Sequence, residues 1–146
     1  MRQLTKSDVE DAFEVCYFNR VQAKNLEEAR EIVDKIEARY QEGVSVHWLI
    51  EDIASGKIVG TCGYYRGFEN ECGEVGYIMK AAYRRGGYMT EAVRLATEFG
   101  FKSMQLKKVF ATTAQSNLPS QGVLRKNGFI AAGTLENGDL KFHLIR

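Results

Sequence analysis

The stretch Glu74-Val-Gly-Tyr-Ile-Met-Lys-Ala-Ala-Tyr-Arg-Arg-Gly-Gly-Tyr-Met-Thr-Glu91 decides the fold of this chain. Its pattern predicts a strand, a short connection, a basic glycine turn and the first turn of a long helix. The first N–H groups of a helix lack partners within it and carry partial positive charge, so such a junction can hold phosphate. Gly86 and Gly87 let the backbone approach closely, and Arg84 and Arg85 add charged donors. An ordinary basic surface turn is the alternative interpretation.

The pattern differs from two common phosphate-binding motifs. It lacks the Gly-x-x-x-x-Gly-Lys-Ser/Thr of nucleotide-hydrolysing P-loops and the Gly-x-Gly-x-x-Gly of dinucleotide folds. It resembles the pyrophosphate loop of the GNAT family of N-acetyltransferases, Gln/Arg-x-x-Gly-x-Gly/Ala. Arg84 takes the first position and Gly87 the central glycine, while Met89 stands where Gly or Ala is usual.

A second block strengthens this resemblance. Asn117-Leu-Pro-Ser-Gln-Gly-Val-Leu-Arg-Lys-Asn-Gly-Phe129 looks like the Asn-x-x-Ser…Lys-x-Gly-Phe segment of the RimJ/RimL-like branch, which acetylates ribosomal-protein N-termini. The two matches are ordered as in the family, and the resemblance covers nearly the whole chain. It implies an α+β GNAT fold, a mostly antiparallel sheet with a central splayed parallel strand pair flanked by helices.

Composition bounds the remaining possibilities. The length of 146 residues predicts one domain, 1–146, with a real core. The net charge of +1 argues against a nucleic-acid partner, and no apolar run approaches the roughly 20 residues of a membrane span. The start does not look like a signal peptide. Cys16, Cys62 and Cys72 lack metal-ligand spacing and suggest reduced thiols, so we expect a cytoplasmic protein without a metal site.

The first half of the chain predicts one short strand, two helices and a meander. Leu4-Thr5 looks like the tail of a first strand that is stunted, or trimmed, compared with the family. Capping patterns at 7–10 and 25–28 precede helical stripes that run to Tyr17 and Tyr40. Alternating apolar residues then predict strands over 44–51, 58–65 and 71–79 in an antiparallel meander.

The second half predicts the order helix, strand, helix, hairpin. A helix begins near Met89 and buries Ala92, Val93, Ala96, Phe99 and Gly100. The strand over 109–114 is expected to run parallel to the one before that helix, because a helix crossover separates them. Asn117 caps a short helix that Asn127-Gly128 ends. The last element is a hairpin over 129–145 with a two-residue turn at Asn137-Gly138.

The resemblance implies that the cofactor is acetyl-CoA. Its pyrophosphate would bind the N–H groups from Arg85 to Thr90, and its pantetheine arm the strand that ends at Ile78-Met79. Asn117, at the mouth of the split, would bond the arm, or serve only as an N-cap. Lys126 would neutralise the 3′-phosphate, or be a solvated helix end. The implied cofactor-binding residues are Ile78, Met79, Arg84, Arg85, Gly86, Gly87, Tyr88, Met89, Thr90 and Asn117.

Catalysis requires a base, an oxyanion donor and a partner for the departing thiolate. By resemblance, a backbone N–H near Met79 stabilises the oxyanion. Glu74 is the candidate base, acting through a water, with a strand-edge charge as the alternative. His47 and His143 are rival bases, although lone strand histidines are more often structural. The tyrosine of many family members is replaced by Leu124, so Ser120 becomes the candidate donor to the thiolate, or else satisfies a helix N-terminus.

The leading interpretation is an acetyl-CoA-dependent N-acetyltransferase acting on a primary amine, as a monomer or homodimer. The second block favours a protein N-terminus as acceptor, while small-molecule amines remain open. The alternative is a non-catalytic acyl-CoA-binding module, supported by the missing tyrosine and by Met89. A phosphopeptide- or nucleotide-binding domain would rest on the basic loop alone and leaves 117–129 unexplained.

Overall fold

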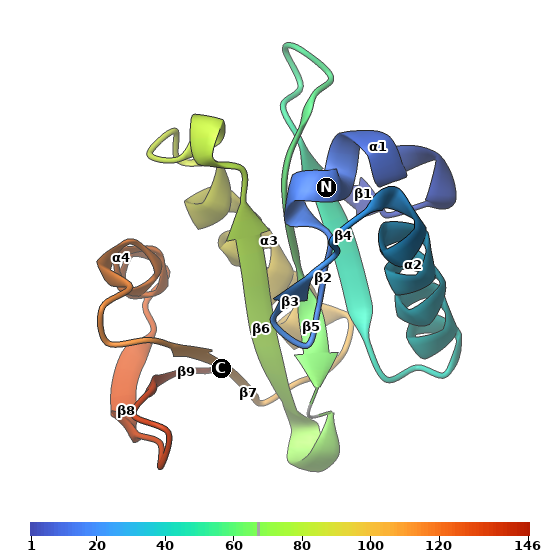
Figure 1. Cartoon of the computed structure of the whole chain (residues 1–146). Helices are drawn as coiled ribbons and strands as arrows, with labels where there is room; N and C mark the ends of the chain where they lie inside the picture. Colours follow the sequence, from blue (N-terminus) through green and yellow to red (C-terminus); the bar gives the residue numbers. More distant parts are fainter. Residues whose placement is uncertain (67) are drawn as a thin grey trace.

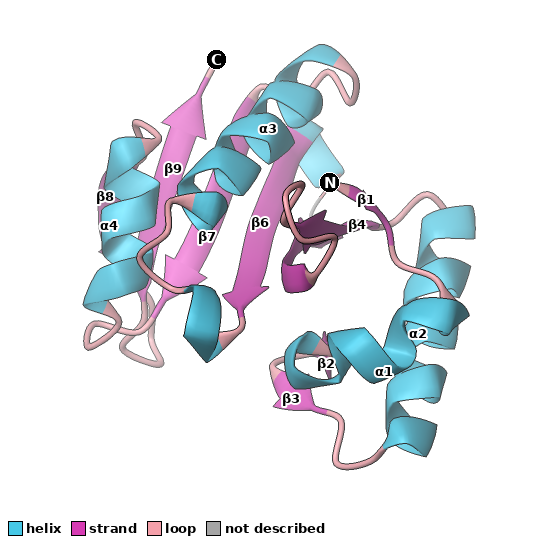
Figure 2. Ribbon diagram, turned by 90° about the horizontal axis from the view of Figure 1, so that it is seen from above, coloured by secondary structure: helices cyan, strands magenta, loops and turns pink. Residues whose placement is uncertain are grey.

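The computed structural model describes residues 1–66 and 68–146. Within these ranges a seven-stranded sheet has helices on both faces (Figures 1 and 2). All neighbouring strands are antiparallel except β6 and β7. The fold class expected from the resemblance is therefore confirmed. In sheet order the strands are β1 Arg2–Gln3, β4 Val46–Glu51, β5 Ile58–Arg66, β6 Cys72–Met79, β7 Lys108–Thr113, β9 Leu140–Ile145 and β8 Ile130–Thr134.

Two apolar clusters lie on the two faces of the sheet. One joins α3, Tyr88–Lys102, and α4, Leu118–Lys126, to the strands, and the other involves α1, Val9–Ala12, and α2, Leu26–Gln41. The predicted buried stripe of α3 is confirmed except at Phe99, which is 38% exposed and lies edge-on against Trp48. Gly100 is required where it lies, because a Cβ there would collide with the Tyr64 hydroxyl.

The first strand starts earlier than predicted. β1 pairs antiparallel with β4, with Arg2 opposite Leu49. Leu4, which the sequence placed at the tail of the strand, is instead buried with the side chains of α1 and α2. The strand has only two residues, as short as the sequence suggested.

The capping box of the first helical segment is at Thr5 and Asp8 rather than at Ser7 and Glu10. The Asp8 carboxylate accepts a hydrogen bond from the Thr5 N–H at 2.9 Å. Arg2, reaching over from β1, holds the same carboxylate at 2.6 Å. The predicted position of the cap was therefore wrong: Thr5 is the N-cap, and its partner Asp8 is also bound by Arg2 of β1. Around α1, the segment consists of 3₁₀ turns at Lys6–Asp8 and Phe13–Val15.

The helix predicted through Tyr17 ends at Val15, and a small hairpin follows. β2, Tyr17–Phe18, pairs with β3, Val21–Gln22. The turn residues Asn19 and Arg20 have φ of 50° and 68°, and two left-handed residues are what a tight hairpin of type I′ requires. The apolar residues that suggested helical spacing therefore end in a strand.

The second predicted cap is confirmed. The Asn25 side chain accepts a hydrogen bond from the Glu28 N–H at 2.9 Å and starts α2. Ala29, Ile32 and Val33 are buried as expected, whereas Tyr40 is exposed.

The C-terminal hairpin is confirmed, but its turn has one more residue than predicted. The Leu135 carbonyl accepts from the Gly138 N–H at 2.9 Å, and the Leu135 N–H donates to the Asp139 carbonyl at 2.8 Å. Only Gly138, with φ 84°, is left-handed in this turn. A two-residue turn of type I′ needs two such residues, so Glu136 joins Asn137 and Gly138 in the loop. No helix in the described part of the chain is long and apolar enough to cross a membrane.

Candidate active site

The site begins where β6 and β7 separate. Their parallel pairing covers only Cys72 to Glu74, opposite Lys108 to Phe110. Beyond that point β6 is paired only with β5, and β7 only with β9, among the described strands. In the described ranges no strand pairs with the β7-facing edge of β6 from Val75 to Met79. This edge therefore has backbone donors and acceptors available for a ligand.

The N-terminus of α3 opens toward the same region. Gly87 is its N-cap with φ 83°, and its carbonyl accepts the first helical bond, from Glu91, at 3.1 Å. Among residues 1–66 and 68–146 no partner is found for the N–H groups of Tyr88, Met89 and Thr90. The Tyr88 hydroxyl donates to Asp52 at 3.1 Å, which fixes the start of the helix and raises the pKa of Tyr88. Three oriented N–H groups at a helix N-terminus suit an anion.

A cavity of about 630 Å³ lies between this helix end, β6 and α4. Every predicted cofactor-binding residue lines it except Gly86, and Ser120 and Lys126 line it too. Its cationic members are Arg84, Arg85 and Lys126; no acidic residue lines it, and these three form no ion pair with any described residue. The cavity is therefore electropositive. The lining also includes residues that the sequence did not predict for the site: Tyr17, Tyr77, Tyr83, Pro119, Gly122 and Val123.

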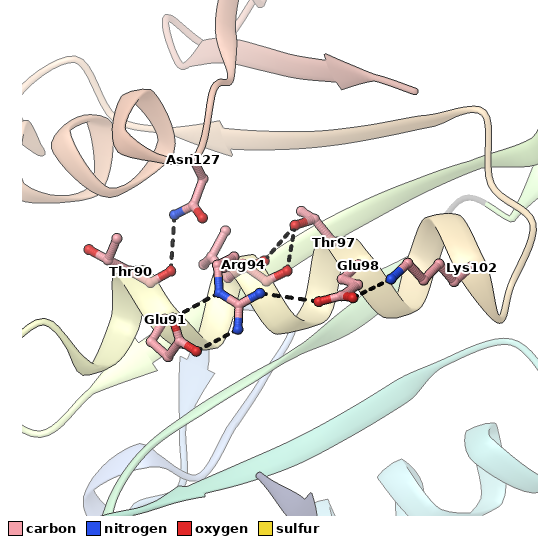
Figure 3. A network of polar contacts seen from close by, with 8 residues as sticks. Thr90, Glu91, Arg94, Thr97, Glu98, Lys102 and Asn127 are labelled. Atoms are coloured by element: carbon pink, nitrogen blue, oxygen red, sulfur yellow. Dashed lines mark hydrogen bonds and ion pairs between the residues drawn. The ribbon is translucent and has the colours of Figure 1, made fainter.

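Contacts between α3 and α4 hold the two helical walls together (Figure 3). The Asn127 amide donates to the Thr90 carbonyl at 3.1 Å and to the Val123 carbonyl at 2.9 Å. On the solvent side of α3, Arg94 and Lys102 both form ion pairs with Glu98. The residue that ends α4 thus also fixes its position beside the α3 N-terminus.

The first turn of α4 faces the cavity. The Asn117 side chain accepts from the Ser120 N–H at 3.2 Å, so its N-cap role is confirmed. Gly122 lines the cavity, and no described atom lies within 4 Å of where its Cβ would be. The absence of a side chain there enlarges the space available to a ligand.

Two hydroxyl groups meet at the wall between β6 and α4. The Tyr77 oxygen lies 2.9 Å from Ser120 Oγ and 3.2 Å from the Ser120 carbonyl oxygen. Burial raises the pKa of Tyr77 to about 12. Leu124, at the family's usual tyrosine position, is fully buried in the core. Ser120 was predicted from the sequence and Tyr77 was not, because a tyrosine inside a strand pattern suggests core packing.

Glu74 lies at the apex of the split, opposite Phe110 in the last paired position. Its two carboxylate oxygens bind Thr112 Oγ1 at 2.9 Å and Arg66 Nε at 3.2 Å. Thr112 in turn accepts from Arg20, which pairs with Asp139 at 2.8 Å. Glu74 does not line the cavity, so its role as a base stays a prediction.

The two rival bases also lie away from the cavity lining. Burial lowers the pKa of His47 to about 4, and its Nδ1 has no partner among the described residues. His143 lies on β9, opposite Phe110 of β7. In the ranges that the structure describes, no group of His, Cys, Asp and Glu side chains is placed to hold a metal ion.

Comparison with known proteins identifies the family. The profile described as "Acetyltransferase (GNAT) domain" matches residues 1–130. The uncharacterized N-acetyltransferase YoaA of Bacillus subtilis (strain 168) is 27% identical over 143 residues, covering 92% of this chain and 81% of YoaA.

Two solved structures share the fold. RimJ of Mycobacterium smegmatis, in complex with CoA-disulfide, has a TM-score of 0.88 at 19% identity, over 99% of this chain and 80% of RimJ. Ribosomal-protein-S5-alanine acetyltransferase of Vibrio fischeri has a TM-score of 0.82 at 20% identity, over 99% of this chain and 91% of that protein. With the family profile spanning residues 1–130, the chain belongs to the GNAT family of N-acetyltransferases.

Proposed function

We propose that the protein transfers the acetyl group of acetyl-CoA to a primary amine by direct attack of the amine within a ternary complex. The observation that carries this proposal is that one electropositive cavity is lined both by the α3 N-terminus and by the segment of β6 that has separated from β7. A pyrophosphate-bearing thioester needs both features together.

The cavity residues fit acetyl-CoA. The N–H groups of Tyr88, Met89 and Thr90 would bind the pyrophosphate, with Arg84 and Arg85 adding charge. The unpaired edge of β6 offers backbone partners for the amides of the pantetheine arm. Lys126, at the far end of α4, is a candidate partner for the 3′-phosphate. When bound, acetyl-CoA supplies the thioester carbonyl carbon that the amine attacks.

Acetyl transfer also requires an acceptor for the proton of the amine and a hydrogen-bond donor to the departing CoA thiolate. Glu74, at the apex of the split, is the proposed acceptor of the amine proton, which would reach it through water because Glu74 itself does not line the cavity. A backbone N–H near Met79 would stabilise the oxyanion. Ser120, which lines the cavity, would donate a hydrogen bond to the sulfur as the C–S bond breaks.

The proposed acceptor is a protein N-terminus, with small-molecule amines as the alternative. The sequence block over 117–129 and the shared fold with a ribosomal-protein acetyltransferase support this choice. A non-catalytic acyl-CoA-binding module is the second candidate, favoured by the engagement of both Glu74 oxygens and by the burial of Leu124. Whether the protein acts as a monomer or a homodimer stays a prediction.

Thiol release from acetyl-CoA tests the proposal. The protein is incubated with acetyl-CoA and either peptides with free N-termini or pooled small amines. Acceptor-dependent thiol release is the expected result, greater with the peptides than with the small amines. N-terminally blocked copies of the same peptides are the matched control. Binding of acetyl-CoA with no acceptor-dependent release would favour the binding module, and no binding would reject both functions.

A further inference from the structure

The contact between Tyr77 and Ser120 joins two elements that are far apart in the chain. Tyr77 comes from β6 and Ser120 from the first turn of α4, and both line the cavity. The phenol oxygen is 2.9 Å from Ser120 Oγ and 3.2 Å from the Ser120 carbonyl oxygen. A free serine hydroxyl rotates, so this contact limits the directions in which it can donate.

The position usually filled by a proton-donating tyrosine cannot serve here. Leu124 occupies it, with no exposed surface and no polar atom in its side chain. Among the hydroxyl groups that line the cavity, Tyr77 and Ser120 are bonded directly to each other. They also lie beside the unpaired segment of β6, where the thioester is expected.

We propose that Tyr77 is a positioning residue whose phenol orients the Ser120 hydroxyl to donate a hydrogen bond to the departing sulfur. The inference rests on the proposed acetyl transfer from acetyl-CoA. In that step the amine nitrogen forms the new C–N bond, the C–S bond breaks, and the sulfur keeps the electron pair. The amine proton leaves to the base, and the thiolate takes its proton from solvent.

The positions of the hydrogens follow from the single proton on each hydroxyl. Without an acceptor in the cavity, Ser120 donates to Tyr77 and the phenol donates to the Ser120 carbonyl. When negative charge develops on the sulfur, Ser120 turns its proton to the sulfur and the phenol donates to Ser120 Oγ. Both partners of this exchange are already within hydrogen-bond distance, so no backbone movement is needed.

The acidity of the phenol favours hydrogen bonding over proton transfer. Burial raises the pKa of Tyr77 to about 12. A thiol of cysteine type has a pKa of about 8.5, so its thiolate is too weak a base to deprotonate this phenol. The pair therefore stabilises the thiolate without ionising and should act at full strength throughout the neutral pH range.

A double-mutant cycle tests the route through Ser120. Ser120→Ala should lower kcat by about tenfold to a hundredfold, the range for a hydrogen bond to a charged group. Tyr77→Phe should lower kcat by a smaller factor and leave the KM for acetyl-CoA unchanged. In the Ser120→Ala background, Tyr77→Phe should cost nothing further. Equal losses in both backgrounds would show that Tyr77 acts independently of Ser120 and overturn the inference.

A binding measurement makes the test independent of turnover. The affinity for CoA and for desulfo-CoA, which lacks the thiol, is measured from pH 6 to pH 10. If the site favours the thiolate, the pKa of the bound thiol falls below that of free CoA, and CoA affinity rises with pH relative to desulfo-CoA. Tyr77→Phe and Ser120→Ala should both reduce this rise, whereas Tyr40→Phe, an exposed phenol outside the cavity, should not.

Two failures can be distinguished. If the unmodified protein binds CoA but its affinity relative to desulfo-CoA is the same at every pH, or the variants match it, the inference is wrong and the proposed function stands. If the unmodified protein binds neither ligand, the proposed function fails and the inference falls with it. Thermal melts of each variant show whether it is folded, and Tyr77→Phe should melt cooperatively because only its hydroxyl is removed.

Discussion

Gly87 offers a direct test of the phosphate-binding helix end. Its φ of 83° is left-handed, and no described atom lies within 4 Å of where a Cβ would be. In Gly87→Val the protein would therefore suffer backbone strain without a collision. The left-handed conformation costs an L residue about 1–3 kcal/mol. For a chain of this size each kcal/mol lowers the Tm by about 2–4 °C, so the expected fall is about 2–12 °C.

The decisive quantity is the stabilisation added by the ligand. Acetyl-CoA at ~100 times its Kd should add about 2.7 kcal/mol, and so raise the Tm of the unmodified protein by about 5–11 °C. In Gly87→Val this increment should disappear, because the new side chain stands where the phosphate would approach the N–H groups of α3.

A matched glycine separates strain from binding. Gly43 also has a left-handed φ, 72°, and also has no described atom within 4 Å of a Cβ, but it does not line the cavity. Gly43→Val should lose similar stability and keep the full increment from acetyl-CoA. If thermal melts with and without acetyl-CoA show that Gly87→Val also keeps the increment, the phosphate does not bind at the N-terminus of α3.

Three further predictions concern the base, an ion pair and two helical glycines. Glu74→Gln should keep acetyl-CoA affinity, lower the rate by ~10²–10⁴-fold and flatten the acidic limb of the pH–rate profile; normal turnover would show that Glu74 is not the base. Arg2 lowers the pKa of Asp8 to about 2, so the pair stabilises the fold above the unfolded pKa of about 4 and this contribution is lost as the pH falls toward 2. In Asp8→Asn, the free energy of unfolding should therefore fall less as the pH is lowered. An unchanged pH dependence of this free energy would contradict the role of the ion pair. Gly100→Ala should lower the free energy of unfolding by about 1–3 kcal/mol, because the new Cβ meets Tyr64. Gly122→Ala should raise it by up to about 1 kcal/mol and weaken acetyl-CoA binding. Denaturant titration measures both changes, and the opposite order would contradict this packing.

The sequence alone determined the features that depend on near neighbours. The Asn25 cap, the Asn117 cap and the turn at Gly87 each follow from residues within a few positions of one another. The strands of the meander follow from the alternation of apolar residues within each segment. The parallel pairing of β6 and β7 also followed, because a crossover helix between two strands constrains their direction. The phosphate-type loop was recognisable for the same reason, since glycines, arginines and a helix start are adjacent in the chain.

Tertiary structure decided whatever depends on distant partners. The capping box formed at Thr5 and Asp8, where Arg2 of β1 binds the Asp8 carboxylate, and Tyr17 joined a hairpin instead of the helix that its spacing predicted. The pairing of Tyr77 with Ser120, 43 positions apart, arises only when α4 packs beside β6. The same packing buries Leu124, and the ion pair with Arg66 occupies Glu74. Side-chain periodicity indicates which residues face a common surface, but register and helix packing set which atoms on that surface come within hydrogen-bond distance.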